Sequence, residues 1–433
     1  MDPNAEWDKI RNEVVDDCLN DNTEEDVIRL VREAQQQANN TSKHRKRRTV
    51  IDRSHEEGHH RLFNDYFFEN PVYTEAQFRR RFHMRRHVFL RIVEALENYD
   101  EYFQRRIDAV GRMGLSPLQK CTAALRILAY GSSADSVDDY VRIGESTTLE
   151  CLDKFVIGVC IIFGAQYMIR PNNEDSARLL QINATRSFPS MLGSIDCMHW
   201  EWKNCPVAWK GQFSRGDHGK HKIMLEAVAS QDLWIRHAYF GTAGSKNDIN
   251  VLNTSDVFND VLNGKAPAVQ YSVNQATYHM GYYLADDIYP EWAIFVKTIP
   301  MPQGEKRKLF AQRQESTRKD VERAFGVLQA RFVIVCDPAR AWHVNTMKHI
   351  MLACIILHNM IVEDERDTYA DNFDYDHVDN NFSTTEASTG LIPNLTTMFE
   401  RITHVHQRKN HCQLQADLVE HIWERFGHEN NES

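Results

Sequence analysis

Hydrophobic positions in the first half of the chain recur at helical spacing. Between residues 70 and 187, apolar side chains repeat every three or four positions, as on the buried face of an amphipathic helix. Two such stripes consist of Phe89, Ile92, Val93 and Leu96, and of Cys121, Ala124, Leu125 and Leu128. This spacing predicts three or four packed helices.

After about Phe188 the pattern changes to short apolar or alternating runs, which are typical of strands. These runs are Met191–Ile195, Met224–Ala229, Trp234–Phe240, Pro267–Ser272 and Trp292–Val296. Helical spacing returns at Val321–Leu328 and in the long apolar stretch Met347–Ile361. Strands followed by helices predict a mixed α/β domain.

These changes of pattern divide the chain into four parts. Residues 1–69 are polar and charged, with one short amphipathic stretch at Val27–Ala34, and are predicted to form a flexible arm. Residues 70–187 form the helical part and residues 188–362 the α/β domain. Residues 363–433 begin as an acidic, Asn-rich linker and end in an amphipathic helix around Leu414–Phe426.

A helix-turn-helix is one interpretation of the helical part. Two short helices are expected around Ser116–Pro117 and at Asp135–Tyr140, with Gly131–Ser133 between them. Most such pairs serve only packing, but a cluster of arginines in the same segment favours contact with the major groove of DNA. The arginines predicted to bind DNA are Arg79, Arg80 and Arg81.

Composition narrows the class of protein. A chain of 433 residues, 42% of them hydrophobic, can bury a sizeable core, which excludes disorder throughout. The lack of a long apolar run and the acidic N-terminus argue against a membrane protein and a signal peptide. Nine cysteines without a Cys-x-x-Cys pair argue against a disulfide framework and a zinc ribbon. We therefore expect a soluble intracellular protein.

The net charge of −10 is distributed unevenly. Residues 1–30 carry −7, residues 363–379 carry −7 and residues 380–433 carry −3, so residues 31–362 carry +7. A basic body suits DNA, whereas acidic ends suit a basic protein partner. One basic cluster in the arm is predicted to be a nuclear-localisation or phosphate-binding signal, with a solvated charge run as the alternative. Its residues are Lys43, Arg45, Lys46, Arg47 and Arg48.

Four carboxylates stand where strands or helices are expected to expose them. Each alone is more commonly a turn, cap or solvated residue. Converging carboxylates need a cation, and hard ions such as Mg²⁺ or Mn²⁺ suit oxygen donors. Two ions about 3.5–4 Å apart are typical of phosphodiester cleavage, so the pattern favours nuclease chemistry. The four are Asp196 at the end of an apolar run, Asp248 in a glycine-rich turn, Asp286 after Tyr282–Ala285, and Glu322 beside a helical apolar stripe.

Basic residues interleaved with Trp202, Trp209 and Phe213 fill the loop after the first acid. Such a mixture suits contacts to the DNA backbone and stacking on bases, and a solvated hairpin surface is the alternative. The residues predicted to contact DNA are Lys203, Lys210, Arg215, Lys220 and Lys222, joined by Arg318 ahead of Glu322.

Five ordered motifs together resemble those of the PIF/Harbinger transposases, above all the Pong-like plant members and their domesticated nuclease relatives. The motifs are Ser194–Trp200, Gly244–Leu252, Leu284–Pro290, Arg318–Phe332 and Leu357–Asn359. The resemblance runs from about Phe63 to Val362. It implies a ribonuclease H-like mixed sheet with flanking helices, carrying a DDE-type endonuclease site.

Carried over by position, the resemblance assigns catalysis to Asp196, Asp248 and Glu322, and metal binding to these three and Asp286. The implied cofactor is a divalent cation, Mg²⁺ or Mn²⁺, with two ions. The implied reaction is hydrolysis of phosphodiesters at element ends by a water whose pKa the ion lowers, followed by strand transfer.

The chain departs from the family pattern at two places. Family members often have Gly-Asp-Ser-Gly-Tyr-Pro where this chain has Ala285–Pro290, so Asp287 is a rival to Asp286. Many related enzymes place a Lys seven residues after the Glu, where this chain has Gln329. That change would remove a phosphate contact.

The resemblance also implies partners. They are the terminal inverted repeats and target site in DNA, and a Myb/SANT-like DNA-binding protein that aids nuclear import; a homodimer is a further option. The expected location is the nucleus, or the cytoplasm without the partner. The alternative function is a domesticated protein that binds DNA or chromatin without cleaving it, and the intact acids favour the enzyme.

Overall fold

The computed structural model describes residues 51–109, 111–168, 181–214, 219–246, 251–252, 255, 270–370 and 407–427, with only the backbone at 367–370. From Ser54 onward these residues belong to one compact unit, Ser54–Ser433. Several predicted features lie outside the described residues: the basic cluster at 43–48, the stretch Val27–Ala34, Arg215, Asp248 and the linker residues 371–406.

The helical part begins earlier than the pattern predicts. Helix α3 spans His55–Tyr66, so the prediction of a flexible arm is wrong over these residues. The sequence pattern does not predict this helix, because only Gly58, Leu62 and Tyr66 of its 12 residues are buried and the apolar stripe is weak. The other main helices confirm the prediction of three or four: α4 (Glu75–Phe82), α5 (Arg86–Tyr99), α6 (Pro117–Tyr130) and α8 (Glu145–Tyr167).

The expected pair of short helices has a different form. Helix α6 has 14 residues, most of them buried, and it begins with a capping box between Ser116 and Gln119. It ends at Gly131, whose φ of 61° is readily adopted by glycine. The turn η2 (Asp135–Val137) and the four-residue helix α7 (Asp138–Val141) follow. A core helix followed by a single turn replaces the two short helices, and DNA reading by this segment stays a prediction.

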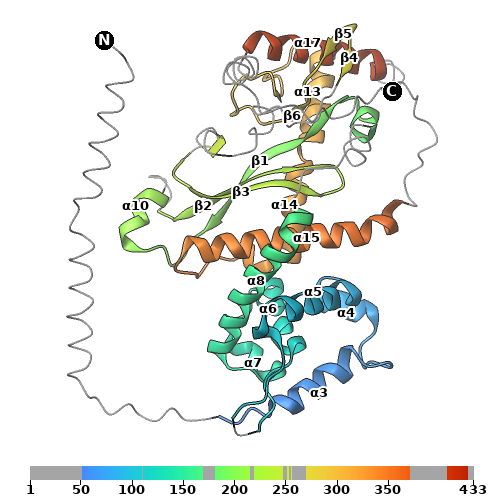
Figure 1. Cartoon of the computed structure of the whole chain (residues 1–433). Helices are drawn as coiled ribbons and strands as arrows, with labels where there is room; N and C mark the ends of the chain where they lie inside the picture. Colours follow the sequence, from blue (N-terminus) through green and yellow to red (C-terminus); the bar gives the residue numbers. More distant parts are fainter. Residues whose placement is uncertain are drawn as a thin grey trace, which may run out of the picture. The chain divides into compact units, whose positions relative to one another are not determined.

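A five-stranded mixed sheet forms the centre of the α/β part, in the order β3-β2-β1-β6-β7 (Figure 1). Strands β1, β2 and β3 are antiparallel neighbours, whereas β6 runs parallel to β1, and β7 parallel to β6. This mixed sheet with flanking helices is compatible with a nuclease-like core. Its strands are β1 (Met191–Glu201), β2 (Lys222–Ala229), β3 (Ile235–Ala243), β6 (Tyr282–Leu284) and β7 (Phe295–Val296).

Strand β1 is longer than the apolar run that predicts it. It pairs with β2 as far as Glu201, so Asp196 lies in the middle of the strand and not at its end. The reason is a switch from a continuous apolar run to alternation, because Met198 and Trp200 remain buried beyond Asp196. The first predicted acid is therefore held on both sides by ordered strand.

Helix α15 (Val344–Ala370) joins the sheet to the helical part, and Figure 1 shows it in orange between them. Its buried Asn359 accepts a hydrogen bond from the N–H of Ile235 at 3.0 Å. The same amide donates to the carbonyls of Ile235 at 2.8 Å and Tyr167 at 2.9 Å. The adjacent His358 contacts the carbonyl of Leu233 at 2.8 Å. The last of the five motifs therefore ties β3 and α8 to α15.

The same helix corrects the predicted start of the acidic linker at residue 363. Glu363, Asp364 and Glu365 continue α15, and Glu365 is buried between Arg79 and Arg331. The stretch Val344–Arg366 is long and apolar enough to cross a membrane, but 67% of its most apolar window is buried inside the fold. It is a core helix.

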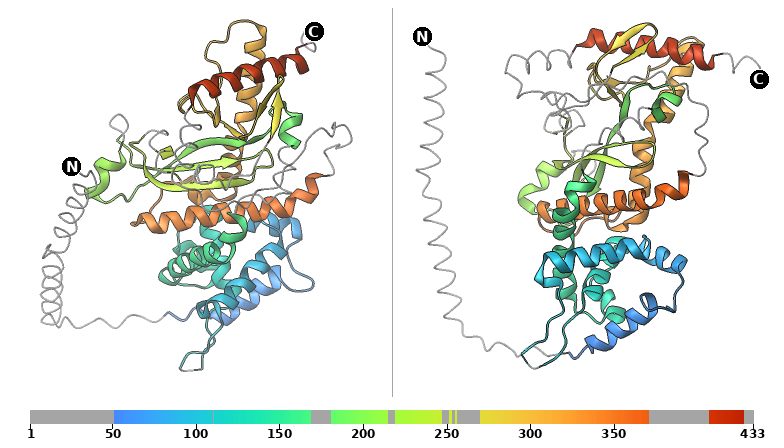
Figure 2. Two further views of the ribbon diagram at one scale, coloured as in Figure 1. Left: turned by 45° about the horizontal axis from the view of Figure 1, so that its top comes forward. Right: turned by 45° about the vertical axis from the view of Figure 1, so that its right-hand side comes forward.

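The C-terminal helix is confirmed and packs on the α/β part. Helix α17 (Arg408–Phe426) contacts α13 (Glu305–Arg318), β7 and the hairpin of β4 (Tyr271–Val273) and β5 (Ala276–Tyr278) (Figure 2). Leu414, Leu418 and Ile422 share one apolar cluster with Tyr282 and Phe310. Asp417 accepts hydrogen bonds from Asn274, at 3.0 Å, and from Tyr278. The helix thus contacts the edge strand β7, which is next to the strand that precedes Asp286.

Candidate active site

Arg318 lies between the first and the last of the predicted catalytic acids. Its Nη1 is 3.7 Å from Oδ2 of Asp196 and 3.0 Å from Oε1 of Glu322. Asp196 comes from β1, Arg318 ends α13, and Glu322 lies in the first turn of α14 (Asp320–Arg331). The fold thus joins two acids that are far apart in the sequence.

The end of α13 is fixed against the sheet by two buried polar side chains. Nε2 of Gln314 donates to the carbonyl of Ala285 at 3.2 Å and to that of Val296 at 3.1 Å. Oγ of Ser194 donates to the carbonyl of Thr317 at 3.2 Å. These bonds link the last turn of α13 to β1, β6 and β7, and so position Arg318. The sequence pattern gave no sign of Gln314, because a polar residue on a polar helix carries no periodic signal.

Asp286 follows the strand next to the one that holds Asp196. Ser194 pairs with Leu284 in the parallel ladder, and each acid lies two residues further along its chain. Asp286, just beyond the end of β6, therefore corresponds in position to Asp196 on the neighbouring strand β1. Asp287 is exposed and forms an ion pair with Lys297 at 3.5 Å. This geometry favours Asp286 over its rival.

The second predicted catalytic acid, Asp248, lies outside the described residues. The chain leading towards it is anchored at the end of β3, where the N–H of Gly244 donates to the carbonyl of Lys222 at 2.8 Å. After it, Val251 and Leu252 are buried. Leu252 packs in one apolar cluster with Ile195 of β1 and Ala285. The described residues before and after this segment, Gly244 and Leu252, thus both contact the sheet.

The donor set suits a hard divalent cation. Asp196, Asp286 and Glu322 offer carboxylate oxygens, the ligands that Mg²⁺ and Mn²⁺ prefer. Within the ranges that the structure describes, no group of three or more His, Cys, Asp or Glu side chains is arranged to hold a metal ion. In the structure, the guanidinium of Arg318 supplies the positive charge between two of these acids.

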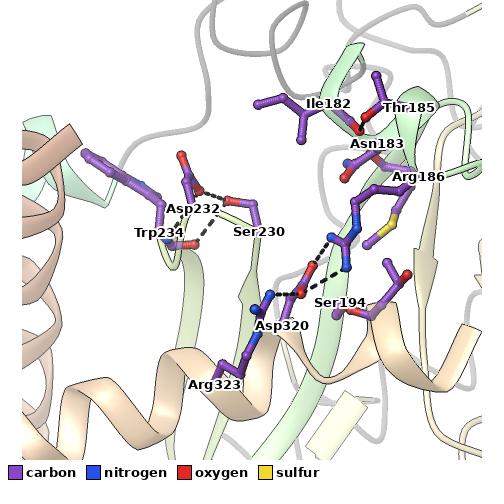
Figure 3. A network of polar contacts seen from close by, with 12 residues as sticks. Ile182, Asn183, Thr185, Arg186, Ser194, Ser230, Asp232, Trp234, Asp320 and Arg323 are labelled. Atoms are coloured by element: carbon purple, nitrogen blue, oxygen red, sulfur yellow. Dashed lines mark hydrogen bonds and ion pairs between the residues drawn. The ribbon is translucent and has the colours of Figure 1, made fainter. Parts of the chain in front are cut away.

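A buried carboxylate that the motifs did not single out holds the start of α14. Asp320 is fully buried and pairs with Arg186, whose Nη2 lies 3.2 Å from Oδ1, and with Arg323 (Figure 3). Arg186 precedes β1, so the network joins the base of β1 to the helix that carries Glu322. A buried carboxylate is tolerated only while its negative charge stays paired, and here two arginines pair with it. We infer that Asp320 positions α14.

The residues after β1 that are predicted to contact DNA differ in their exposure. Lys203 and Lys210 are exposed, Lys222 is half-buried in β2, and Lys220 forms an ion pair with Glu201 at 2.8 Å. Among the interleaved aromatic residues, Trp202 and Phe213 are core, and Trp209 reaches the surface.

The three arginines predicted to bind DNA have different surroundings. Arg79 pairs with Glu365 of α15, and the guanidinium of Arg81 lies 3.8 Å from the ring centroid of Tyr73. Arg80 is exposed. The first two therefore have structural contacts within the chain, and their contact with DNA stays a prediction.

Comparison with known families places this site in a recognised domain. Residues 165–369 match the family described as "Plant transposon protein", and residues 58–97 match a domain of unknown function. The first match contains the four predicted metal-binding acids, Asp196, Asp248, Asp286 and Glu322. No solved structure matches the chain.

Curated relatives point the same way. The chain is 23% identical over 262 residues to the Bos taurus protein named "Putative nuclease HARBI1", across 59% of this chain and 70% of that protein. It is 23% identical over 263 residues to the Arabidopsis thaliana "Protein ALP1-like", across 59% of this chain and 63% of that protein. The Homo sapiens protein with the HARBI1 name is also 23% identical, with 59% and 70% covered.

Proposed function

We propose that the chain is a DNA endonuclease of the DDE type. Support comes from the match of residues 165–369 to the family described as "Plant transposon protein" and from the similarity to the protein named "Putative nuclease HARBI1". The observation that carries the proposal is the meeting of Asp196 and Glu322 at Arg318, with Asp286 just beyond the end of the neighbouring strand. The substrate is the phosphodiester at an element end, and the freed 3′-hydroxyl then attacks target DNA.

Asp196, Asp248, Asp286 and Glu322 would hold Mg²⁺ or Mn²⁺, in all two ions. When bound, such ions stabilise the charge of the transferring phosphoryl group and lower the pKa of water. The chain's own contribution is to bring the acids together and to orient the phosphate. Arg318 is the residue placed to bind it, since its guanidinium already lies among carboxylates and can exchange them for a phosphate. Gln329 donates to Sδ of Met198 at 3.2 Å, so it faces the sheet.

We further propose a nuclear location, import through the cluster at Lys43–Arg48, and a Myb/SANT-like partner that recognises the inverted repeats. Support comes from the charge distribution, because an acidic segment attracts a basic DNA-binding protein. Within the C-terminal acidic part, Glu363–Glu365 and α17 already have contacts inside the fold. Residues 371–406 are therefore the better candidate for docking.

One observation supports a second function. Arg318 forms ion pairs with two of the acids, and these contacts would also stabilise a domesticated protein that binds DNA or chromatin and does not cut it. The retained set of acids argues for cleavage, since a pure scaffold has no need of converging carboxylates. The first function is therefore preferred.

A cleavage assay with the full chain tests the proposal. The substrate is a labelled duplex with an inverted-repeat end and its flank, incubated with Mg²⁺ or Mn²⁺, with and without the partner. We expect metal-dependent nicks at the end and a loss of about 100-fold or more in Asp196→Asn. The exposed neighbour of the site, Lys319→Ala, serves as the matched control. Equal cutting by the wild type and Asp196→Asn would refute the assignment.

A further inference from the structure

Two exposed tryptophans lie on two loops, one that follows β1 and one that precedes α15. Trp209 is 42% exposed and ends the turn η3 (Val207–Trp209), which runs into the short helix α10 (Lys210–Phe213). Trp342 is 64% exposed and lies just before α15. A large aromatic side chain at the surface is costly to solvate, so two of them on adjoining loops indicate a binding surface.

The two loops are held together by hydrogen bonds. Nε1 of Trp202 donates to the carbonyl of Ala341 at 2.8 Å, and the N–H of Lys203 donates to that of Ala339 at 2.9 Å. The buried ring of Trp202 also lies 5.9 Å from the ring of Trp209, centroid to centroid. Trp202 therefore contacts one exposed tryptophan directly and the backbone next to the other. The exposed indoles are presented from a rigid base.

The charges around the two indoles are mostly positive. Residues 202–214 and 336–343 contain Lys203, Lys210 and Arg340 and a single acid, Asp337. The three cations are exposed, and none has an ion-pair partner among the described residues. We call Trp209, Trp342, Lys203, Lys210 and Arg340 the indole surface. Its charge favours a polyanion over an apolar peptide.

The indole surface is connected to the candidate active site. Oγ of Ser245 donates to the carbonyl of Gln212 on α10, and Ser245 belongs to the turn that leads to Asp248. Along β1, Trp202 lies six residues from Asp196, which corresponds to roughly 20 Å at about 3.3 Å per residue. A DNA strand of about six nucleotides spans such a distance.

We propose that the indole surface binds unpaired nucleotides of DNA beside the cleaved bond, with the indoles stacking on bases and the three cations contacting phosphates. The inference rests on the proposed function, which makes DNA the substrate. Unpaired bases are favoured over duplex because an indole stacks on a base only when the face of that base is free. The side chains that would contact DNA all belong to the two loops, which the sheet and α15 hold in place.

Binding measurements on the full chain test this proposal. Fluorescence anisotropy compares a labelled 20-nucleotide single strand with a blunt duplex of the same sequence, in the Asp196→Asn background so that no DNA is cut. We expect Trp209→Ala and Trp342→Ala each to weaken single-strand binding about fivefold or more, since stacking contributes about 1–3 kcal/mol per base. Duplex binding should change little. Trp209→Phe should retain most of the affinity, because phenylalanine also stacks.

Matched controls separate the surface from general effects. Tyr99→Ala removes another exposed aromatic residue, on α5, and should leave single-strand binding unchanged. Thermal unfolding of each variant confirms that the fold is retained. Lys203→Ala combined with Lys210→Ala should weaken both forms of DNA and reduce the salt dependence.

Three outcomes decide the matter. Unchanged single-strand binding in the Trp209→Ala, Trp342→Ala double variant overturns the proposal, and if that variant loses a protein partner instead, the surface serves protein docking. A wild type that does not bind the single strand also overturns it. If single-strand binding depends on the two tryptophans but the wild type does not cut DNA in the cleavage assay, the indole surface is supported and the nuclease function is refuted.

Discussion

Nη1 of Arg318 lies 3.0 Å from Oε1 of Glu322, across the boundary between helices α13 and α14. The spacing of four residues places the arginine one helical turn before the last catalytic acid of the proposed site. Because the same guanidinium also contacts Asp196, its positive charge reduces the repulsion between the carboxylates of Asp196 and Glu322. The predictions below begin from this contact.

Removal of Arg318 should make the fold more dependent on metal. In Arg318→Ala the carboxylates of Asp196 and Glu322 lose this cation and repel each other, so a divalent ion relieves more strain than in the wild type. We expect a lower Tm without metal and a larger rise in Tm with Mn²⁺, measured by thermal shift. Lys319→Ala removes an adjacent exposed cation as the control. Equal Mn²⁺ shifts in the two variants would contradict this role.

The two neighbouring aspartates after β6 should differ in cleavage. Asp286 corresponds in position to Asp196 on the adjacent strand, whereas Asp287 is exposed and paired with Lys297. We expect Asp286→Asn to reduce the rate of cleavage by about 100-fold or more and Asp287→Asn by less than about threefold. The end-cleavage assay measures both. The reverse order would make Asp287 the ligand.

Loss of the amide of Asn359 should destabilise the whole unit. Asn359→Ala leaves the N–H and carbonyl of Ile235 and the carbonyl of Tyr167 without this partner in a buried position. Each unsatisfied group costs about 1–3 kcal/mol, so the loss of all three bonds should lower the free energy of unfolding by at least about 3 kcal/mol. Urea denaturation measures this change. Asn345→Ala, on the exposed face of the same helix, should have almost no effect.

Burial of His358 should make stability fall in acid. Burial, and to a smaller extent the nearby Arg331, lower its pKa from 6.5 to about 3. The folded state thus favours the neutral ring, and the unfolded state binds the proton first. The stabilisation is complete above pH 6.5 and declines as the pH falls from there towards 3, by at most about 1.4 kcal/mol per unit. His358→Gln should flatten this part of the pH profile in urea titrations, and an identical slope would disprove the assignment.

Docking of a basic partner should depend on the segment between α15 and α17. Replacement of residues 371–406 by a neutral Gly/Ser linker of equal length removes acidic charge and keeps both helices. We expect a Myb/SANT-like partner to be retained less in a pull-down, with the effect diminishing at high salt. Truncation at residue 370 is a poor substitute, because it also removes α17 and uncovers the cluster around Leu418. A linker variant that binds the partner normally would exclude this segment.

Local patterns in the sequence account for much of the fold. Helical spacing at Phe89–Leu96 and Val321–Leu328, and apolar runs at Met224–Ala229, correspond to α5, α14 and β2, because each element buries one face of its own residues. The motifs also name Asp196 and Glu322 from their surroundings in the chain. Periodicity failed where burial was sparse, as in α3, or where alternation followed a continuous run, as in β1.

Tertiary structure alone decided which residues meet. Arg318 joins Asp196 to Glu322, Gln314 ties α13 to two strands, and Asp320 pairs with Arg186, although no pattern along the chain links these positions. The same holds for Trp209 and Trp342, whose loops are joined by hydrogen bonds such as that from Trp202 to the carbonyl of Ala341. Residue type and spacing determine helices, strands and the chemistry available, since those depend on near neighbours. Contacts between distant side chains depend on how the sheet and its helices pack, and that packing forms the site.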